Sequence, residues 1–265
     1  MRCPSCGFAW VAAGLMRTSS GLSIYEDSTR ALFEDFADYY RDASADDAAV
    51  TKLNWVGEFV QGGRLLDVGA NYGHFISHAV DRFDAIGMEP SPQAVDWART
   101  NLRALIERGS IGDDRSDFAG RFDVITMFDV IEHLESPLVA LQQCRRFLAP
   151  HGRLFITTPD AGSVMARLLG RAWYHYDLEQ HISIFSVANL QRVLEACGFT
   201  VIQKRRLTRR YRFSYIDRRL RDLGRESMLF RTAHAVAFPL RLFPQRRIAI
   251  NLHDVIGVVA RLREE

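Results

Sequence analysis

The sequence lacks an apolar run long enough to cross a membrane, because polar side chains interrupt every window of about 18 to 20 residues. The N-terminus, MRCPSCGFAW, also lacks the basic start and apolar stretch of a secretory signal. We therefore expect a cytoplasmic protein. Its 265 residues, 48% hydrophobic and 25% charged, have the composition of one globular domain with additions.

Cysteine is also scarce. The chain has four, and Cys144 and Cys197 each stand alone in a segment expected to be helical, so no disulfide framework is indicated. Only Cys3 and Cys6 form a pair, in the sequence CPSCG, which has the local shape of a zinc knuckle. Tetrahedral structural zinc needs four ligands, and the chain offers no second pair. We expect no functional metal. Free thiols, or a zinc site shared by two chains, are the alternatives.

The net charge of +2 is too small to indicate nucleic-acid binding by the whole protein. Arginine nevertheless crowds into residues 208–252, where RRYRFSYIDRRLRDLGRE precedes the apolar MLFRTAHAVAFPLRLF. This insertion is too short and too interrupted to span a bilayer. Two interpretations stay open: a solvated face packed on the core, or an interfacial helix pair that makes peripheral contact with a membrane.

Short apolar strands alternate with helical segments through the middle of the chain. Repeated strand–helix units predict an α/β protein with a doubly wound, mostly parallel sheet. Four strands have the composition of buried strands: RLLDV at 64–68, DAIGMEP at 84–90, FDVITMFD at 122–129 and RLFITTPD at 153–160. The later segment TVIQKRRL is expected to pair with the last apolar run, DVIGVVARLR.

Two helices have recognisable ends. One is expected over residues 91–109, opened by Ser91 with Pro92 in its first turn. The other is expected between an N-cap at Ser186 and a stop at Gly198. It should turn four residues inward: Leu190, Val193, Leu194 and Cys197.

These features divide the chain into five parts. They are a cysteine-containing N-terminal segment (1–24), a lid of two helices (25–61), the α/β core (62–207), the basic and apolar insertion (208–252) and the last core strand (253–265).

In a doubly wound sheet, ligands bind at the carboxyl ends of the strands, which points to the loop Gly69–Gly73 after the first strand. A dinucleotide fingerprint needs three glycines here and finds one, so NAD is disfavoured. The methyltransferase pattern D-x-G-x-G-x-G fits better, because Asp67, Gly69 and Gly73 match and Asn71 is the one departure. Asparagine tolerates a positive φ, so the tight turn can be kept.

Glu89 ends the second strand, 22 residues after Asp67. A carboxylate there can accept hydrogen bonds from both ribose hydroxyls of a nucleoside, and Asp67 can accept from the ammonium of a methionine moiety. An acid at a strand end is often only a turn residue. The joint spacing of the two acids favours the cofactor interpretation.

Taken together, LLDVGANYGHF, GMEPS, FDVITMFDVIEHLESP and FLAPHGRLFITTPD resemble successive motifs of class I S-adenosylmethionine-dependent methyltransferases, over residues 64–160. The DVIEHL box and the later EQHISIFS resemble a subgroup that modifies small molecules, sugars or lipid-linked intermediates. The resemblance implies a Rossmann-like, seven-stranded sheet with an antiparallel last strand and S-adenosyl-L-methionine as cofactor. It also implies that the cysteine pair is the remnant of an N-terminal zinc ribbon.

By this resemblance, the cofactor contacts fall on nine residues: Asp67, Gly69 and Gly73 at the methionine end, Glu89 at the ribose, Phe128 and Asp129 closing the pocket, Asp113 at the adenine, and Asn71 and Phe75 as further contacts. Asp114 could replace Asp113. The third strand of the family would fall within residues 110–118, where the apolar signal is nearly absent.

Methyl transfer is an in-line displacement at an already activated sulfonium, so positioning and removal of the nucleophile's proton dominate. His181 in EQHIS is our first candidate for the base and His133 in IEHLE the second, although either could be structural. We expect methyl transfer to a small molecule, with oxygen favoured and no nucleic acid as partner. The alternatives are a non-catalytic S-adenosylmethionine-binding scaffold and an RNA-modifying enzyme.

Overall fold

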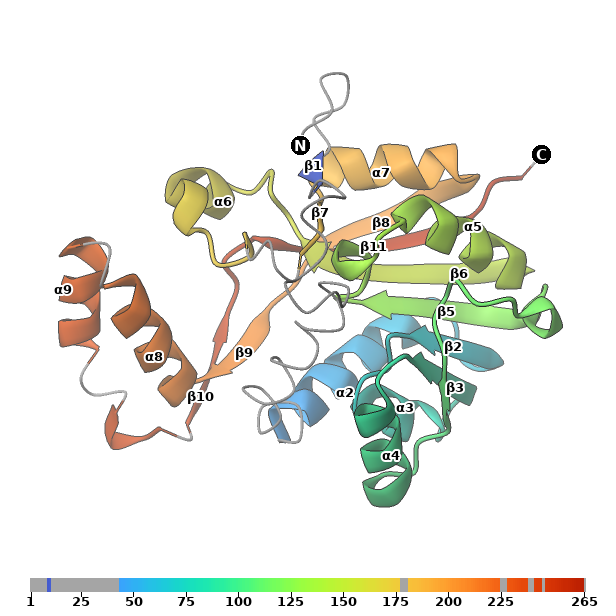
Figure 1. The fold of residues 1–265 in the computed structure, drawn as a ribbon, viewed down its shortest axis with the longest axis horizontal. Coiled ribbons are helices and arrows are strands. Elements are labelled where there is room, and N and C mark those ends of the chain that lie inside the picture. Colours follow the sequence, from blue (N-terminus) through green and yellow to red (C-terminus); the bar gives the residue numbers. More distant parts are fainter. Residues whose placement is uncertain are drawn as a thin grey trace, which may run out of the picture.

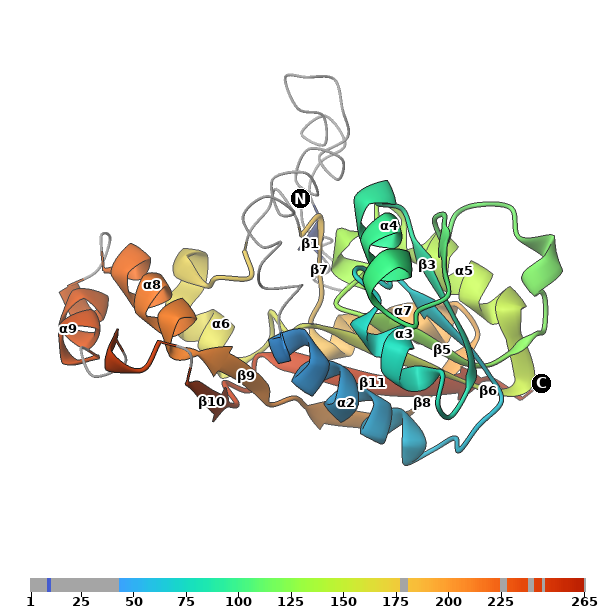
Figure 2. The same cartoon turned by 90° about the horizontal axis from the view of Figure 1, so that it is seen from below.

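The computed structural model describes residues 9–10, 43–176, 181–224, 228–237, 241–244 and 246–264. Its centre is a seven-stranded sheet with the strand order β4-β3-β2-β5-β6-β11-β8, drawn in Figures 1 and 2. Its strands are β2 (Arg64–Val68), β3 (Asp84–Glu89), β4 (Ile106–Arg108), β5 (Phe122–Phe128), β6 (Leu148–Pro159), β8 (Phe199–Arg206) and β11 (Val255–Leu262). The pairs from β4 to β6 are parallel, and β11 is antiparallel to both β6 and β8. The predicted fold class is confirmed.

The strand order reverses beside β2, since β3 and β4 lie on one side of it and β5 and β6 on the other. In such sheets the crevice at the reversal point is the usual ligand site. Asp67 lies near the carboxyl end of β2, Glu89 ends β3 and Phe128 ends β5. The three side chains therefore come from adjacent strands at one edge of the sheet.

Helices cover both faces of the sheet (Figures 1 and 2). α2, α3 and α4 bury Trp55, Ile76 and Val95 in a core cluster on one face. α5 and α7 bury Phe147 and Leu194 in a second cluster. The helices are α2 (Ala43–Gly57), α3 (His74–Ala79), α4 (Pro92–Asn101), α5 (Pro137–Phe147), α6 (Val164–Leu169) and α7 (Val187–Ala196), with α8 (Phe213–Leu223) and α9 (Met228–Val236) outside the sheet.

α7 has the ends that the sequence predicted. Ser186 Oγ accepts a 3.3 Å hydrogen bond from the amide of Asn189, and Gly198 ends the helix with a φ of +83°. The predicted inward residues are buried, except that Val193 is only partly so.

The helix predicted over residues 91–109 was wrong in its second half. α4 ends at Asn101, and Ile106–Arg108 form the edge strand β4 beside β3. The family's third strand was expected within 110–118, where the structure instead has a turn and a short 3-10 helix, Ser116–Phe118. The helical periodicity misled because Ile106 is fully buried by its pairing with Gly87, a tertiary contact.

Residues 208–252, here called the arm, lie between β8 and β11. The arm carries α8 and α9 on a stalk of two antiparallel strands, β9 (Arg209–Arg212) and β10 (Arg247–Ile250). Arg206 pairs with Ile256, and Pro159 at the end of β6 pairs with Val255. The arm therefore leaves and re-enters the sheet at the edge where the parallel strands end, and it projects away from the sheet (Figures 1 and 2).

Close to this edge, β1 (Ala9–Trp10) pairs with β7 (Ser183–Ile184). The cysteine pair and the first helix expected within 25–61 lie outside the described residues. No helix in the described part of the chain is long and apolar enough to span a bilayer.

Candidate active site

The loop after β2 is a tight turn. Gly69 has a φ of +74°, and a Cβ there would lie only 2.5 Å from Val130 Cγ2. Asn71 has a φ of +50°, and its Oδ1 accepts a 2.7 Å hydrogen bond from the amide of Tyr72. Asparagine thus takes the left-handed conformation that the sequence suggested it could tolerate and fixes it with its own side chain.

Gly73 is needed for packing. It has a φ of +79° at the start of α3, and a Cβ would lie 2.7 Å from Ile106 Cδ1 and 3.1 Å from Ala98 Cβ. Glycine therefore lets the loop approach α4 and β4. This requirement holds with or without a cofactor, so the assignment of Gly73 to the methionine end stays a prediction.

Glu89 is bound to the loop through the backbone. Its Oε2 accepts a 2.9 Å hydrogen bond from the amide of Asn71, and its Oε1 accepts one of 2.9 Å from the amide of Ser91. The side chain is 4% exposed, and burial raises the pKa of Glu89, a shift that the two amide hydrogen bonds oppose. Each carboxylate oxygen keeps a second lone pair for a ligand hydroxyl.

Asp67 is buried beside this acid. The hydroxyl of Thr126 donates a 2.5 Å hydrogen bond to Asp67 Oδ1. Burial raises the pKa of Asp67 to about 7, and the negative charge of Glu89 adds to the rise, whereas Thr126 and the charge of Lys52 lower it. Two buried acids thus share a region with little compensating positive charge.

Lys52, which the sequence analysis did not single out, comes from α2. Its Nζ forms a 3.3 Å ion pair with Asp129 Oδ2 and lies 4.8 Å from the centre of the Phe128 ring. The sequence offered only a lysine in an amphipathic helix that precedes the core, with nothing to relate it to a strand end almost 80 residues later.

The other predicted cofactor residues fall into two places. Phe75 of α3 packs edge-to-face on Phe128, with ring centres 5.1 Å apart, and Asp129 beyond it has a φ of +61°. These three lie together near Lys52. Asp113 is exposed and accepts a 2.7 Å hydrogen bond from the amide of Ser110, which explains its position as a turn residue. Its adenine contact remains a prediction.

The two predicted histidines lie side by side, although 48 residues separate them. The ring centres of His133 and His181 are 4.8 Å apart. His181 Nδ1 lies 2.7 Å from the carbonyl oxygen of His175. A carbonyl only accepts, so Nδ1 carries the hydrogen and the neutral ring presents Nε2 as its acceptor.

Buried Glu132 completes this cluster. Glu132, His133 and His181 each offer a ligand atom, and the three atoms lie within 4.8 Å of one another. Glu132 thus places a buried carboxylate beside both imidazoles. The same atoms are suited to a divalent metal ion, so the prediction of no functional metal stays open.

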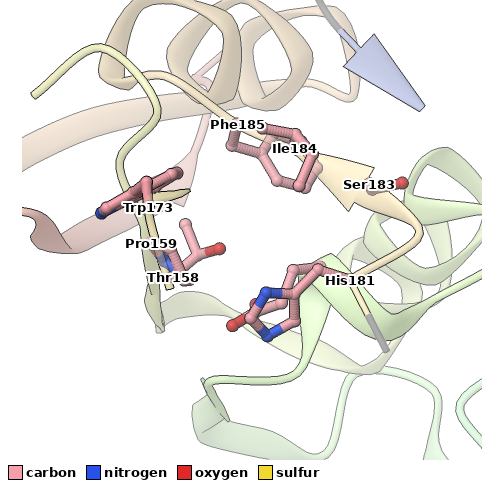
Figure 3. A pocket seen from close by; sticks show the side chains of 8 residues that line it. Thr158, Pro159, Trp173, His181, Ser183, Ile184 and Phe185 are labelled. Atoms are coloured by element: carbon pink, nitrogen blue, oxygen red, sulfur yellow. The ribbon is translucent and has the colours of Figure 1, made fainter. Parts of the chain in front are cut away.

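A small hollow adjoins His181. Figure 3 shows Thr158 between Trp173 and His181, with Phe185 and Ile184 opposite. The hollow is lined by Glu132, Thr158, Pro159, Trp173, His181, Ser183, Ile184 and Phe185. Its walls are mainly apolar, and the two ionisable side chains belong to the cluster just described. Its volume of about 10 Å³ is room for one water-sized group, so it marks an opening beside His181 and is too small to hold a substrate ring.

Trp173 and Tyr174 both donate hydrogen bonds to one carboxylate. Trp173 is 2% exposed, and its Nε1 donates a 3.2 Å hydrogen bond to Asp254 Oδ2, which also accepts a 2.5 Å hydrogen bond from the Tyr174 hydroxyl. The two rings are therefore anchored to the chain at the start of β11. Trp173 forms a fixed wall of the hollow.

The acids at the sheet edge fit S-adenosylmethionine. This ligand carries a sulfonium, an ammonium and two ribose hydroxyls. Burial disfavours the charged forms of Asp67 and Glu89, and a cationic ligand would supply the missing compensation. Two buried carboxylates suit a nucleoside that carries a positive charge, as the sequence predicted. They would repel the pyrophosphate of a dinucleotide.

Comparison with known proteins agrees with this fold. Residues 37–204, more than half of the chain, match the methyltransferase domain family. The 1,6-didemethyltoxoflavin-N1-methyltransferase of Burkholderia thailandensis superposes with a TM-score of 0.59 at 14% identity, covering 99% of this chain and 97% of that one. A SAM-dependent methyltransferase of Thermotoga maritima gives 0.56 at 18% identity, covering 87% and 97%.

Curated relatives share less of their length. The ubiquinone biosynthesis O-methyltransferase of Xanthomonas oryzae pv. oryzae is 30% identical over 133 residues, which cover 43% of this chain and 55% of that protein. The chain thus spans about half the length of the curated relatives it matches.

The fold is that of the methyltransferase structures compared above. The chain belongs to the methyltransferase domain family.

Proposed function

We propose that the chain is an S-adenosylmethionine-dependent methyltransferase that acts on a hydroxyl oxygen of a small molecule. The observation that carries the proposal is the joining of the loop and Glu89 through the Asn71 amide, beside buried Asp67. The Burkholderia relative was crystallised with S-adenosylhomocysteine, which supports the same cofactor. When bound, S-adenosylmethionine supplies an electrophilic methyl group on a sulfonium.

The residues of the chain have separate tasks in this proposal. Glu89 accepts from the ribose hydroxyls, and Asp67 accepts from the ammonium, with Lys52 keeping Asp67 closer to its charged form. The acceptor hydroxyl would approach at the small hollow beside His181. His181 Nε2 removes the hydroxyl proton, and the carbonyl of His175 holds its ring in the required tautomer.

Oxygen is favoured by the presence of this base, because a hydroxyl must lose its proton as it attacks whereas a neutral amine attacks without prior deprotonation. The names of the curated relatives as O-methyltransferases point the same way. The apolar walls favour an acceptor with an apolar part, such as an alkyl phenol or a lipid-linked intermediate, over a bare saccharide.

Formation of S-adenosylhomocysteine from S-adenosylmethionine tests the proposal, with catechol, alkyl phenols and hexoses as acceptors. H181Q should lower kcat by about 10² to 10⁴, the range of a lost general base, and leave the binding of S-adenosylhomocysteine unchanged. H133Q should cost less. H151Q, at an exposed position of β6, is the matched control.

Two results would redirect the proposal. Tight cofactor binding with no turnover on any acceptor would favour the non-catalytic scaffold. Activity that EDTA abolishes and one divalent metal restores would make Glu132, His133 and His181 a metal centre, with His181 a ligand and no longer the base.

A further inference from the structure

The arm and the rest of the chain carry opposite charge. Residues 208–252 contain eleven arginines and three acids, a net charge of +8, whereas the other 220 residues carry −6. The small total of +2 therefore hides a strongly dipolar molecule. A basic segment of this kind is attracted to polyanions and anionic surfaces.

The described part of the arm also exposes large apolar side chains. They are Met228 (69% exposed), Val236 (75%), Leu242 (63%), Phe243 (58%) and Ile248 (43%). Single exposed apolar residues are ordinary, but five in one short projecting segment, among exposed Arg221, Arg231 and Arg246, are the mark of an interaction surface.

The arm is a built structure. Asp217 of α8, 6% exposed, accepts hydrogen bonds of 2.7 Å from Arg221 Nη2 and from Arg241 Nε, and His234 Nε2 of α9 lies 3.1 Å from it. One buried carboxylate thus joins α8, α9 and the segment after them. The exposed apolar side chains of the arm lie outside this cluster.

The arm is also fixed to the active-site edge of the sheet. Asp254, two residues after the arm, accepts from Trp173 and Tyr174, and its carbonyl oxygen accepts a 2.7 Å hydrogen bond from the amide of Asp160. Asp160 in turn is ion-paired with Arg206, two residues before the arm. The base of the arm is therefore fixed to the edge of the sheet that carries the hollow beside His181.

We propose that the arm binds an anionic lipid surface, with its arginines at the headgroups and its apolar side chains among the acyl chains. Basic and apolar residues together fit this partner, because nucleic acid requires the charge but leaves Leu242 and Phe243 without a role. Membrane contact itself does not depend on the proposed function. The delivery of an apolar acceptor from the bilayer to the active site does depend on it.

Co-sedimentation of the full chain with vesicles tests this proposal. We expect binding to phosphatidylcholine vesicles that contain phosphatidylglycerol, weak binding to phosphatidylcholine alone, and loss of binding at high salt. L242S/F243S and R246E/R247E should each lower partitioning by roughly tenfold or more. L105S and R103E are matched controls, because Leu105 and Arg103 are exposed and lie outside the arm. Both variants should bind as the wild type does.

Three outcomes would overturn the proposal. One is no binding of the wild type to anionic vesicles. Another is a wild-type dimer in light scattering that L242S/F243S converts to monomer, which would make the arm a contact between two copies. The third is RNA binding that L242S/F243S leaves intact. Titration with S-adenosylhomocysteine on the same proteins separates this proposal from the function, because cofactor binding should be equal in all of them.

Discussion

The backbone amide of Asn71 donates a 2.9 Å hydrogen bond to Glu89 Oε2, so the loop after β2 and the acid that ends β3 form one unit. The position where the methyltransferase pattern is broken is thereby the position whose amide holds Glu89. A residue there must adopt a positive φ and keep its amide pointed at Glu89, and asparagine does both.

Gly69 should be intolerant of even a methyl group. G69A places a Cβ 2.5 Å from Val130 Cγ2 at a φ of +74°, and we expect a loss of about 1 to 3 kcal/mol in the free energy of unfolding. The double variant G69A/V130A should recover the part of this loss that comes from the steric clash. It should retain the part that comes from the strained backbone at position 69. Urea unfolding of the four proteins in this cycle measures both, and additive effects would show that the two residues do not collide.

Asp67 should make both stability and cofactor binding depend on pH. Because its pKa is raised to about 7 in the folded protein, the fold binds this proton more tightly than the unfolded chain does. That contribution is fully present below pH 4 and is lost as pH rises through about 7. D67N should remove it, so the stability difference between wild type and D67N should change across this window in urea unfolding.

Cofactor binding should show the opposite pH trend, since the ammonium of the ligand favours ionised Asp67. Affinity for S-adenosylhomocysteine should rise as pH increases towards 7, and the rise should be absent in D67N. Equal slopes for the two proteins in calorimetric titrations would show that Asp67 does not contact the ammonium.

Lys52 should affect the pH dependence that Asp67 gives to cofactor binding. Its charge lowers the pKa of Asp67 and pairs with Asp129, so K52M should shift the pH dependence of cofactor binding upward and weaken binding at neutral pH. K52R should restore much of both. A pH profile for K52M that overlays the wild type would mean that the lysine acts only through packing on Phe128.

Asp254 should stabilise the fold by holding Trp173, which forms a wall of the hollow. D254A removes the acceptor for Trp173 and Tyr174 and leaves their polar groups buried, so we expect roughly 1 to 3 kcal/mol of destabilisation. D254N, which keeps an acceptor oxygen, should lose less. Tryptophan fluorescence during unfolding follows both variants, and equal stability of D254A and wild type would contradict the assignment.

The sequence revealed the parts of the fold that local patterns encode. The buried strands, the cap at Ser186 and the positive φ at Asn71 each have a local signature, and each is found in the structure. β4 was missed because Ile106 owes its conformation to a neighbouring strand and not to its own segment.

The candidate site divides in the same way. Asp67 and Glu89 were found because they follow strands at a known spacing, whereas Lys52 reaches Asp129 from a helix 77 residues earlier. That His133 and His181 meet, with Glu132 beside them, depends on how β7 lies against the DVIEHL segment. No local pattern encodes such a contact.

Calorimetric titration with S-adenosylmethionine tests the central claim most directly. The wild type should bind one equivalent, and E89A should bind about 10- to 100-fold more weakly, as expected for lost hydrogen bonds to a charged group worth about 1.5 to 3 kcal/mol. E58A, an exposed acid paired with Arg205, should bind as wild type does. No binding by the wild type, or equal binding by E89A, would contradict the account.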